Sequence, residues 1–186
     1  MPTIITHGLF AVSLAHVFKH SSLPLRFWPL ALACSMLPDL DVIGFSLGVK
    51  YSDFWGHRGF SHSIAFALAT GLIIVLLAFF QERYRPLRLR LVLFFFLVTA
   101  SHGVFDAMTN GGLGIAFFSP IDTTRYFLPI RPIQVSPIGL RNFLEWGGWR
   151  VLDSEFKWIA LPSLALLIFS VTIRHVYRRR PTGTQT

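Results

Sequence analysis

Apolar stretches separated by short polar and charged connections dominate the pattern of this chain. The clearest one covers 61–80 and contains an unbroken apolar run over 64–80, which is long enough for a transmembrane helix. The first stretch, 4–18, would span only about 22 Å as a helix, so it is either a short transmembrane span or a re-entrant helix. The pattern predicts an all-α integral membrane helical bundle in a single domain over 1–186. About five transmembrane or re-entrant segments are expected, at 4–18, 27–37, 61–80, 91–106 and 159–177.

The connections between these stretches carry their own signals. Pro38 predicts the end of the second helix, followed by a polar connection over 39–59. Ser61 is the predicted N-cap of the third helix. The stretch 107–157 is predicted to be a long outer loop of mostly irregular structure. Its later part predicts a short helix at the membrane interface, because it carries Trp146, Trp149 and Trp158.

Charged residues are few and unevenly placed. They make up 14% of the 186 residues, whereas soluble domains have about 25%. The net charge is +8, but the basic residues form no groove-like run, which excludes nucleic acid as a partner. Most of the 17 lysines and arginines belong to one side of the predicted bundle, at Lys19, Arg26, 83–90 and 174–180. The positive-inside rule makes that side cytoplasmic, with the N-terminus outside and the C-terminus inside.

Four polar clusters fall at the opposite, outer ends of the predicted segments. His7 begins the first segment, and Asp39 and Asp41 follow the second. His57 and His62 precede the third, and His102 and Asp106 close the fourth. Ionisable groups in or near a bilayer cost free energy and point to function. Since all four clusters share one depth, we expect the seven side chains to converge in one pocket. This pocket is expected to open toward the outer loop.

The residue types in these clusters are those of a metal site. His102 and Asp106 are four residues apart, so both face one side of a helix. His57 and His62 are five apart, which places His57 in the loop and His62 in the first helical turn. Asp39 and Asp41 alternate in a segment expected to be extended. One of them would bind metal while the other bridges, orients a histidine or acts as a base.

The set predicts one or two divalent ions, with zinc favoured and manganese or iron as alternatives. The predicted ligands are His7, Asp39, Asp41, His57, His62, His102 and Asp106. Cys34 is the single cysteine, so neither a disulfide framework nor a thiolate zinc site is expected. A bound metal produces hydroxide from water near neutral pH, and that chemistry is hydrolysis. Asp39, Asp41 and Arg58 are the catalytic candidates, with Arg58 either a phosphate clamp or an interfacial anchor.

The order of these motifs resembles a known family. The matching pieces are Thr6-His7, Leu37-Pro38-Asp39-Leu40-Asp41, the run from His57 through His62 to Ser63, and His102-Gly103-Val104-Phe105-Asp106. Together they are similar to the YdjM-like family of bacterial inner-membrane proteins, described as membrane-bound metal-dependent hydrolases. The resemblance covers roughly 3–140 and implies a location in the bacterial inner membrane. A more distant analogy is to zinc-dependent phospholipase C.

The leading hypothesis is a metal-dependent hydrolase at the outer membrane interface, acting on a lipid or phosphoester, with the lipid bilayer as its partner. A metal-binding transporter or proton relay is the second. It would need polar groups along the bundle, and the spans are apolar apart from Thr70, Thr99 and Ser101. A histidine-box oxygenase would draw on more histidines than share this face. A non-catalytic membrane interaction protein remains an open alternative.

Overall fold

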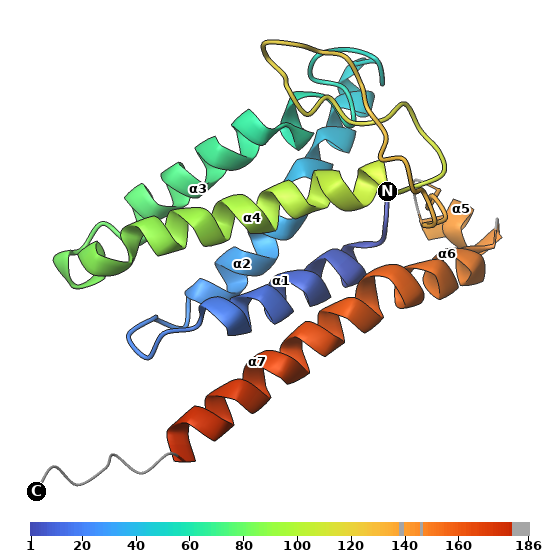
Figure 1. The fold of residues 1–186 in the computed structure, drawn as a ribbon. Helices are drawn as coiled ribbons and strands as arrows, with labels where there is room; N and C mark the ends of the chain where they lie inside the picture. The colour runs from blue at the N-terminus through green and yellow to red at the C-terminus, as the bar shows by residue number, and fades with distance from the viewer. Residues whose placement is uncertain (138–139, 146, 180–186) are drawn as a thin grey trace, which may run out of the picture.

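Helices account for the regular secondary structure of this protein in the computed structural model, which describes residues 1–137, 140–145 and 147–179. Within those residues the β-type contacts are isolated bridges, Thr109 with Ile133 and Ile115 with Tyr126, and no strand is formed. The prediction of an all-α fold is therefore confirmed. The bundle contains α1 (Ile4–Phe18), α2 (Phe27–Met36), α3 (Ile64–Ala78), α4 (Arg88–Ala107) and α7 (Leu161–Arg179), as Figure 1 shows.

Among the described residues, three continuous helical stretches are long and apolar enough to cross a membrane. They are Phe27–Leu47, Glu82–Ala107 and Gly148–Val176. The helices α1 and α3 are also apolar, but each has 15 residues and is shorter than the hydrocarbon core requires. The structure thus supports a membrane protein with three candidate spans, whereas the sequence predicted about five segments.

The structure differs from the prediction after the second helix and before the last one. The α-helix α2 ends at Met36, next to Pro38 as predicted, but the chain then continues as the 3₁₀-helix η1 (Leu37–Leu47), with proline in its first turn, where a polar connection was predicted. Proline is tolerated there, since the first N–H groups of a helix have no partner to lose. The last helix begins early, because α6 (Gly148–Glu155) continues through the π-helix η4 (Phe156–Ala160) into α7.

The predicted outer loop is therefore irregular over 108–137 but helical in its later part, where α5 (Leu140–Glu145) precedes α6. A short helix near the tryptophans exists as α6 and runs on into the last span, while its position at the membrane interface stays a prediction. Trp146 and Arg180 lie outside the described residues.

The helices lie side by side, and their connections divide between the two ends (Figure 1). The irregular segments before α3 and after α4 gather at the end where the N-terminus lies. The short η3 helix (Glu82–Leu87), with its arginines, lies at the other end. An aromatic core joins the helices, with Phe27 of α2 4.7 Å from Phe94 and 5.9 Å from Phe95 of α4, measured between ring centroids.

A glycine lets α3 and α4 approach closely. A Cβ atom at Gly71 would lie 2.8 Å from the Val92 carbonyl oxygen and 3.1 Å from the Phe96 nitrogen. Backbone atoms cannot move aside as a flexible side chain can, so Gly71→Ala forces the two helices apart. We expect the free energy of unfolding to fall by about 1–3 kcal/mol, measured by thermal unfolding in detergent.

The matched control is Gly8→Ala in α1, where a Cβ would meet only side-chain atoms, the nearest being Leu32 Cδ2 at 3.4 Å. Alanine favours a helix over glycine by about 1 kcal/mol, so this variant is expected to unfold at or above the wild-type temperature. Equal losses in both variants would contradict the close approach at Gly71.

Candidate metal centre

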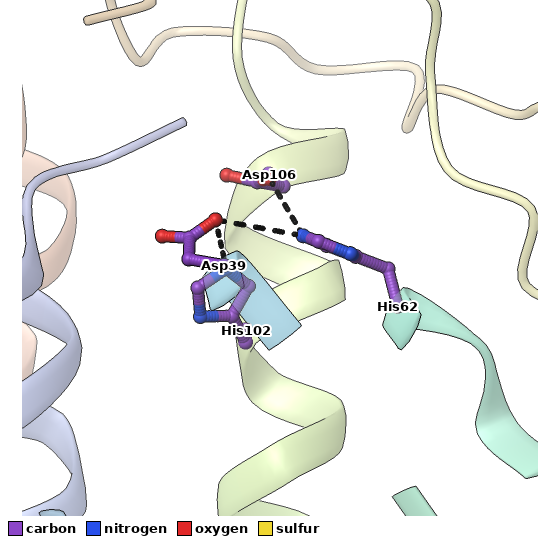
Figure 2. Close-up of side chains that lie close together, drawn as sticks. All are labelled: Asp39, His62, His102 and Asp106. Atoms are coloured by element: carbon purple, nitrogen blue, oxygen red, sulfur yellow. Dashed lines mark ion pairs between the residues drawn. The ribbon is translucent and has the colours of Figure 1, made fainter. Parts of the chain in front are cut away.

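Four side chains from three parts of the chain meet at the end of the bundle that holds the N-terminus (Figure 2). Asp39 lies on η1, His62 ends the short 3₁₀-helix η2 (Phe60–His62), and His102 and Asp106 lie in the last turns of α4. Asp39 Oδ1 is 3.1 Å from His102 Nε2 and 3.7 Å from His62 Nε2. His62 Nε2 is also 3.4 Å from Asp106 Oδ2. Ligands of one ion with bonds of about 2.0–2.2 Å lie at similar separations, roughly 3–4 Å.

Six buried nitrogen and oxygen atoms in and beside this cluster have no aligned hydrogen bond among the described residues. They are His7 Nε2, Asp39 Oδ1, His62 Nε2, His102 Nε2 and both carboxylate oxygens of Asp106. Leaving a buried donor or acceptor unpaired costs about 1–3 kcal/mol, so several such atoms around one point indicate a common partner. A divalent cation fits this set, because imidazole nitrogens and carboxylate oxygens all supply lone pairs to it.

The protein orients His102 for this role. Its Nδ1 lies 2.8 Å from the Ser35 carbonyl oxygen. A carbonyl can only accept a hydrogen bond, so Nδ1 carries the hydrogen and Nε2 presents its lone pair to the cluster. His7 of α1 stacks against His102, with ring centroids 3.9 Å apart and an interplanar angle of 11°. The first helix thus brings one more imidazole to the edge of the cluster.

Asp41 shares His62 with Asp39 but otherwise contacts different side chains. The two aspartates were predicted to lie in an extended segment, and this is wrong, because η1 is helical and turns them apart. Asp41 Oδ1 accepts a hydrogen bond from His57 Nδ1 at 2.7 Å. Its Oδ2 accepts one from Ser61 Oγ at 2.5 Å and lies 3.2 Å from His62 Nδ1. Asp41 therefore orients two histidines, as carboxylates beside metal-binding imidazoles do.

His62 links two groups of side chains that can each hold a metal ion. Asp39, His62, His102 and Asp106 form one group, and Asp41, His57 and His62 form the other. Within each group the ligand atoms lie within 4.8 Å of one another. His62 faces the first group with Nε2 and the second with Nδ1.

Arg58 is completely buried behind the cluster. Its Nε lies 3.2 Å from Asp106 Oδ2, its Nη1 donates to the Gly111 carbonyl at 2.7 Å, and its Nη2 donates to Thr109 Oγ1 at 3.0 Å. The alternative that Arg58 is an interfacial anchor is wrong, because the guanidinium is held inside the protein. It fixes the orientation of Asp106 and ties the loop before η2 to the end of α4.

The electrostatics of the cluster favour a cation. Burial lowers the pKa of His62, but its close contacts with the carboxylates of Asp106, Asp39 and Asp41 outweigh burial and raise that pKa to about 10. Three carboxylates thus surround one imidazole, and a positive charge at its nitrogens is stabilised. A metal ion would supply that charge in place of the proton.

The N-cap of α3 differs from the prediction. Ser63, not Ser61, caps the helix, with its Oγ accepting a hydrogen bond from the Phe66 N–H at 3.0 Å. The α-helix starts later than expected because η2 occupies the preceding residues. Ser61 instead donates to Asp41 and so helps to hold the histidine pair.

All seven predicted ligands thus lie at one end of the bundle. Four form the central cluster, Asp41 and His57 lie beside it, and His7 stacks on His102 at its edge. Figure 2 shows the central four, with Asp39 Oδ1 between the two imidazoles. Their role as metal ligands, and a catalytic role for Asp39, Asp41 and Arg58, stay predictions.

Glu155, a buried residue that supports the site, could not be identified from the sequence. Glu155 is buried and accepts hydrogen bonds from the Thr3 N–H at 2.7 Å, from Thr3 Oγ1 at 2.5 Å and from Thr6 Oγ1 at 3.0 Å. It joins α6 to the first turn of α1, immediately before His7. Nothing local distinguishes Glu155 from Asp153, which forms an exposed ion pair with Lys157 at 2.7 Å.

Replacing Glu155 with alanine is expected to lower the free energy of unfolding by about 2–4 kcal/mol, because two threonines lose a buried acceptor. Asp153→Ala is the control, since an exposed ion pair contributes about 0–1 kcal/mol. Thermal unfolding of both variants in the same detergent tests the difference. Equal effects would show that the Glu155 contacts contribute no more than a surface pair.

Fold and site together define a helical membrane protein with a buried cluster of histidines and aspartates that can hold a metal ion. The chain belongs to the YdjM inner membrane protein family, whose family model matches residues 1–180. It is 34% identical over 167 residues to the inner membrane protein YbcI of Escherichia coli (strain K12), which covers 90% of this chain and 95% of that protein. No solved structure matches. The predicted family and the inner-membrane location are thus confirmed.

Proposed function

We propose that this protein is a membrane-bound metal-dependent hydrolase that acts at the membrane interface on a lipid or phosphoester substrate. The observation that carries this proposal is that Asp39, His62, His102 and Asp106 each bring a buried ligand atom within 4.8 Å of the others, without an aligned hydrogen bond to satisfy it. A structural hydrogen-bond network would pair these atoms with one another or with the backbone. Four side chains whose ligand atoms converge without such hydrogen bonds suit a cation.

In this proposal Asp39, His62, His102 and Asp106 hold the ion, and His7 adds a ligand from α1. The neighbouring group of Asp41, His57 and His62 would hold a second ion only in place of the hydrogen bonds that Asp41 now accepts. Zinc suits the mixed nitrogen and oxygen ligands, and manganese or iron are alternatives. When bound, such an ion acts as a Lewis acid and makes water a nucleophile near neutral pH.

The remaining side chains position this set. Asp41 keeps His62 and His57 in place through their Nδ1 atoms, and Arg58 holds Asp106. Asp39 is the most exposed of the four, at 14% of its side chain, while the others are fully buried. One of its carboxylate oxygens points away from both imidazoles (Figure 2). We assign that oxygen as the acceptor of a proton from the attacking water.

The reaction follows from this arrangement. Hydrolysis of a phosphoester forms a bond from the water oxygen to phosphorus and breaks the phosphorus–oxygen bond to the alcohol. One proton of the water goes to Asp39, which then gives that proton to the leaving alcohol oxygen, while the other water proton stays with the oxygen that is now bonded to phosphorus. We place this end of the bundle on the non-cytoplasmic side, because the arginines of η3 lie at the opposite end (Figure 1).

The hydrogen bonds of polar side chains within the helices favour the hydrolase proposal over the transporter alternative. Thr99 Oγ1 donates to the Phe95 carbonyl and Ser13 Oγ to the Leu9 carbonyl, each within its own helix. A transport pathway needs polar groups that face a continuous route through the bundle. These hydroxyls instead satisfy local backbone groups.

The test of this proposal is metal analysis joined to an activity screen. Protein purified in detergent is expected to contain one or two equivalents of a divalent metal. Removal with a chelator should abolish hydrolysis of phospholipids and chromogenic phosphoesters, and zinc, manganese or iron should restore it. Protein that carries no stoichiometric metal, or activity that survives the chelator, would overturn the proposal.

A further inference from the structure

An apolar groove runs between α1 and the junction of α6 with η4, close to the candidate metal centre. Its volume is about 430 Å³, in the range of small-molecule binding sites. The apolar lining comes from both sides, with Ile5 and Leu9 on α1 facing Leu152, Phe156 and Ala160. Glu155 and the two threonines that hydrogen-bond to it also line the groove, which ties its walls together.

The rim of this groove carries the side chains that favour a membrane interface. Trp149 lines it and is 73% exposed. Tryptophan is enriched at headgroup level, where its ring is partly in the apolar layer and its N–H reaches water. Only 17% of the apolar window of the long helix that forms this wall is buried inside the protein, so in a membrane lipid would cover the helix beside the groove. In a membrane, a lipid is therefore the molecule that would lie next to the groove.

The backbone of the long helix is irregular at this place. The π-helix η4 spans Phe156–Ala160, and both of these residues line the groove. Short π-helical segments inside α-helices are uncommon and occur frequently at functional sites. Here the segment directly follows the buried Glu155, so the irregularity and the polar contact to α1 coincide at the groove.

The groove also approaches the metal centre. A second cavity of about 420 Å³ shares Thr3, Ile5 and Leu152 with the groove and extends along the first residues of the chain to Met1. The Met1 nitrogen lies 4.0 Å from Asp106 Oδ1. An extended molecule with its apolar part in these cavities would therefore have its other end beside the cluster.

We propose that this groove holds an acyl chain of a membrane phospholipid, whose phosphoester lies at the metal centre as the substrate. The inference rests on the proposed hydrolase function and narrows its substrate from any phosphoester to a phospholipid taken from the bilayer. The groove selects the substrate by its acyl chain, and the cluster acts on its headgroup.

The experiment compares two substrates in two variants of the metal-loaded protein. Leu152→Trp fills the groove, and Leu72→Trp on α3 is the control, because the two leucines are similarly exposed, at 43% and 45%. The substrates are dipalmitoyl phosphatidylglycerol in mixed micelles and water-soluble bis(p-nitrophenyl) phosphate. We expect Leu152→Trp to slow phospholipid turnover about ten-fold or more, with the soluble ester unaffected. Leu72→Trp should change neither rate.

A second readout does not depend on activity. A phosphatidylglycerol with a photoreactive diazirine in its acyl chain should label Ile5, Leu9, Leu152 or Phe156, and Leu152→Trp should abolish this labelling. The proposal would be overturned by labelling of residues outside the groove or by crosslinks between two copies of the chain at these residues. It would also be overturned if Leu152→Trp slowed the turnover of both substrates equally. Labelling in the groove without hydrolysis of either substrate would overturn the hydrolase and the substrate role together, leaving only a bound lipid.

Discussion

Purified His62→Ala protein is expected to contain no stoichiometric metal and to show no hydrolysis. His62 joins both groups of candidate ligands, since its Nε2 lies near Asp39 and Asp106 and its Nδ1 lies near Asp41. Removing the ring takes one ligand from each group. Changes to residues that only orient ligands weaken metal binding about 10–100-fold, so loss of this shared ligand should exceed about 100-fold. Elemental analysis and metal titration of the variant measure the effect.

The control is His16→Ala in α1. His16 has the same side chain, but its Nδ1 lies 2.9 Å from the Val12 carbonyl oxygen and its ring packs on Trp28, away from the cluster. It is expected to keep the full metal content. Asp39→Asn separates metal loss from unfolding, because it preserves the shape of the most exposed member of the cluster. Full metal content in both His62→Ala and Asp39→Asn would exclude the proposed centre.

Replacing Arg58 with alanine is expected to cause the largest loss of stability. The guanidinium pairs with buried Asp106 and donates to Gly111 and Thr109, and its place exists only because Gly112 has no side chain. Removing one partner of a buried ion pair costs about 3–5 kcal/mol, since the other charge is left unpaired. Thermal unfolding in detergent measures the loss. Metal binding should weaken as well, because Asp106 loses the contact that orients it.

Two comparisons make the Arg58 result specific. Arg85→Ala removes an exposed arginine, 75% accessible, whose ion pair with Glu82 should contribute about 0–1 kcal/mol. Arg58→Gly removes the same guanidinium but relieves the backbone, whose φ of 66° is unfavourable for a residue with a side chain. Arg58→Gly should therefore be less destabilised than Arg58→Ala. An Arg58→Ala protein as stable as Arg85→Ala would refute the structural role of the pair.

Local patterns in the sequence determined the elements and the end of the bundle at which the polar residues meet. The apolar run 4–18 matches α1 residue for residue, and 91–106 lies within α4. The four-residue spacing of His102 and Asp106 placed both on one helix face, as the structure has them. These predictions succeed because helix periodicity and burial of apolar side chains depend on residues that are near one another in sequence.

The tertiary structure alone decided the role that each polar residue can take. Asp39 and Asp41 look equivalent in sequence, yet η1 turns Asp39 toward His102 and Asp41 toward His57. Arg58 could have been a surface anchor until its partners near Gly111 were known, and Glu155 reaches a threonine 152 residues away. What a buried charge does depends on the partners that satisfy it, and those partners come from segments that only the folded chain brings together.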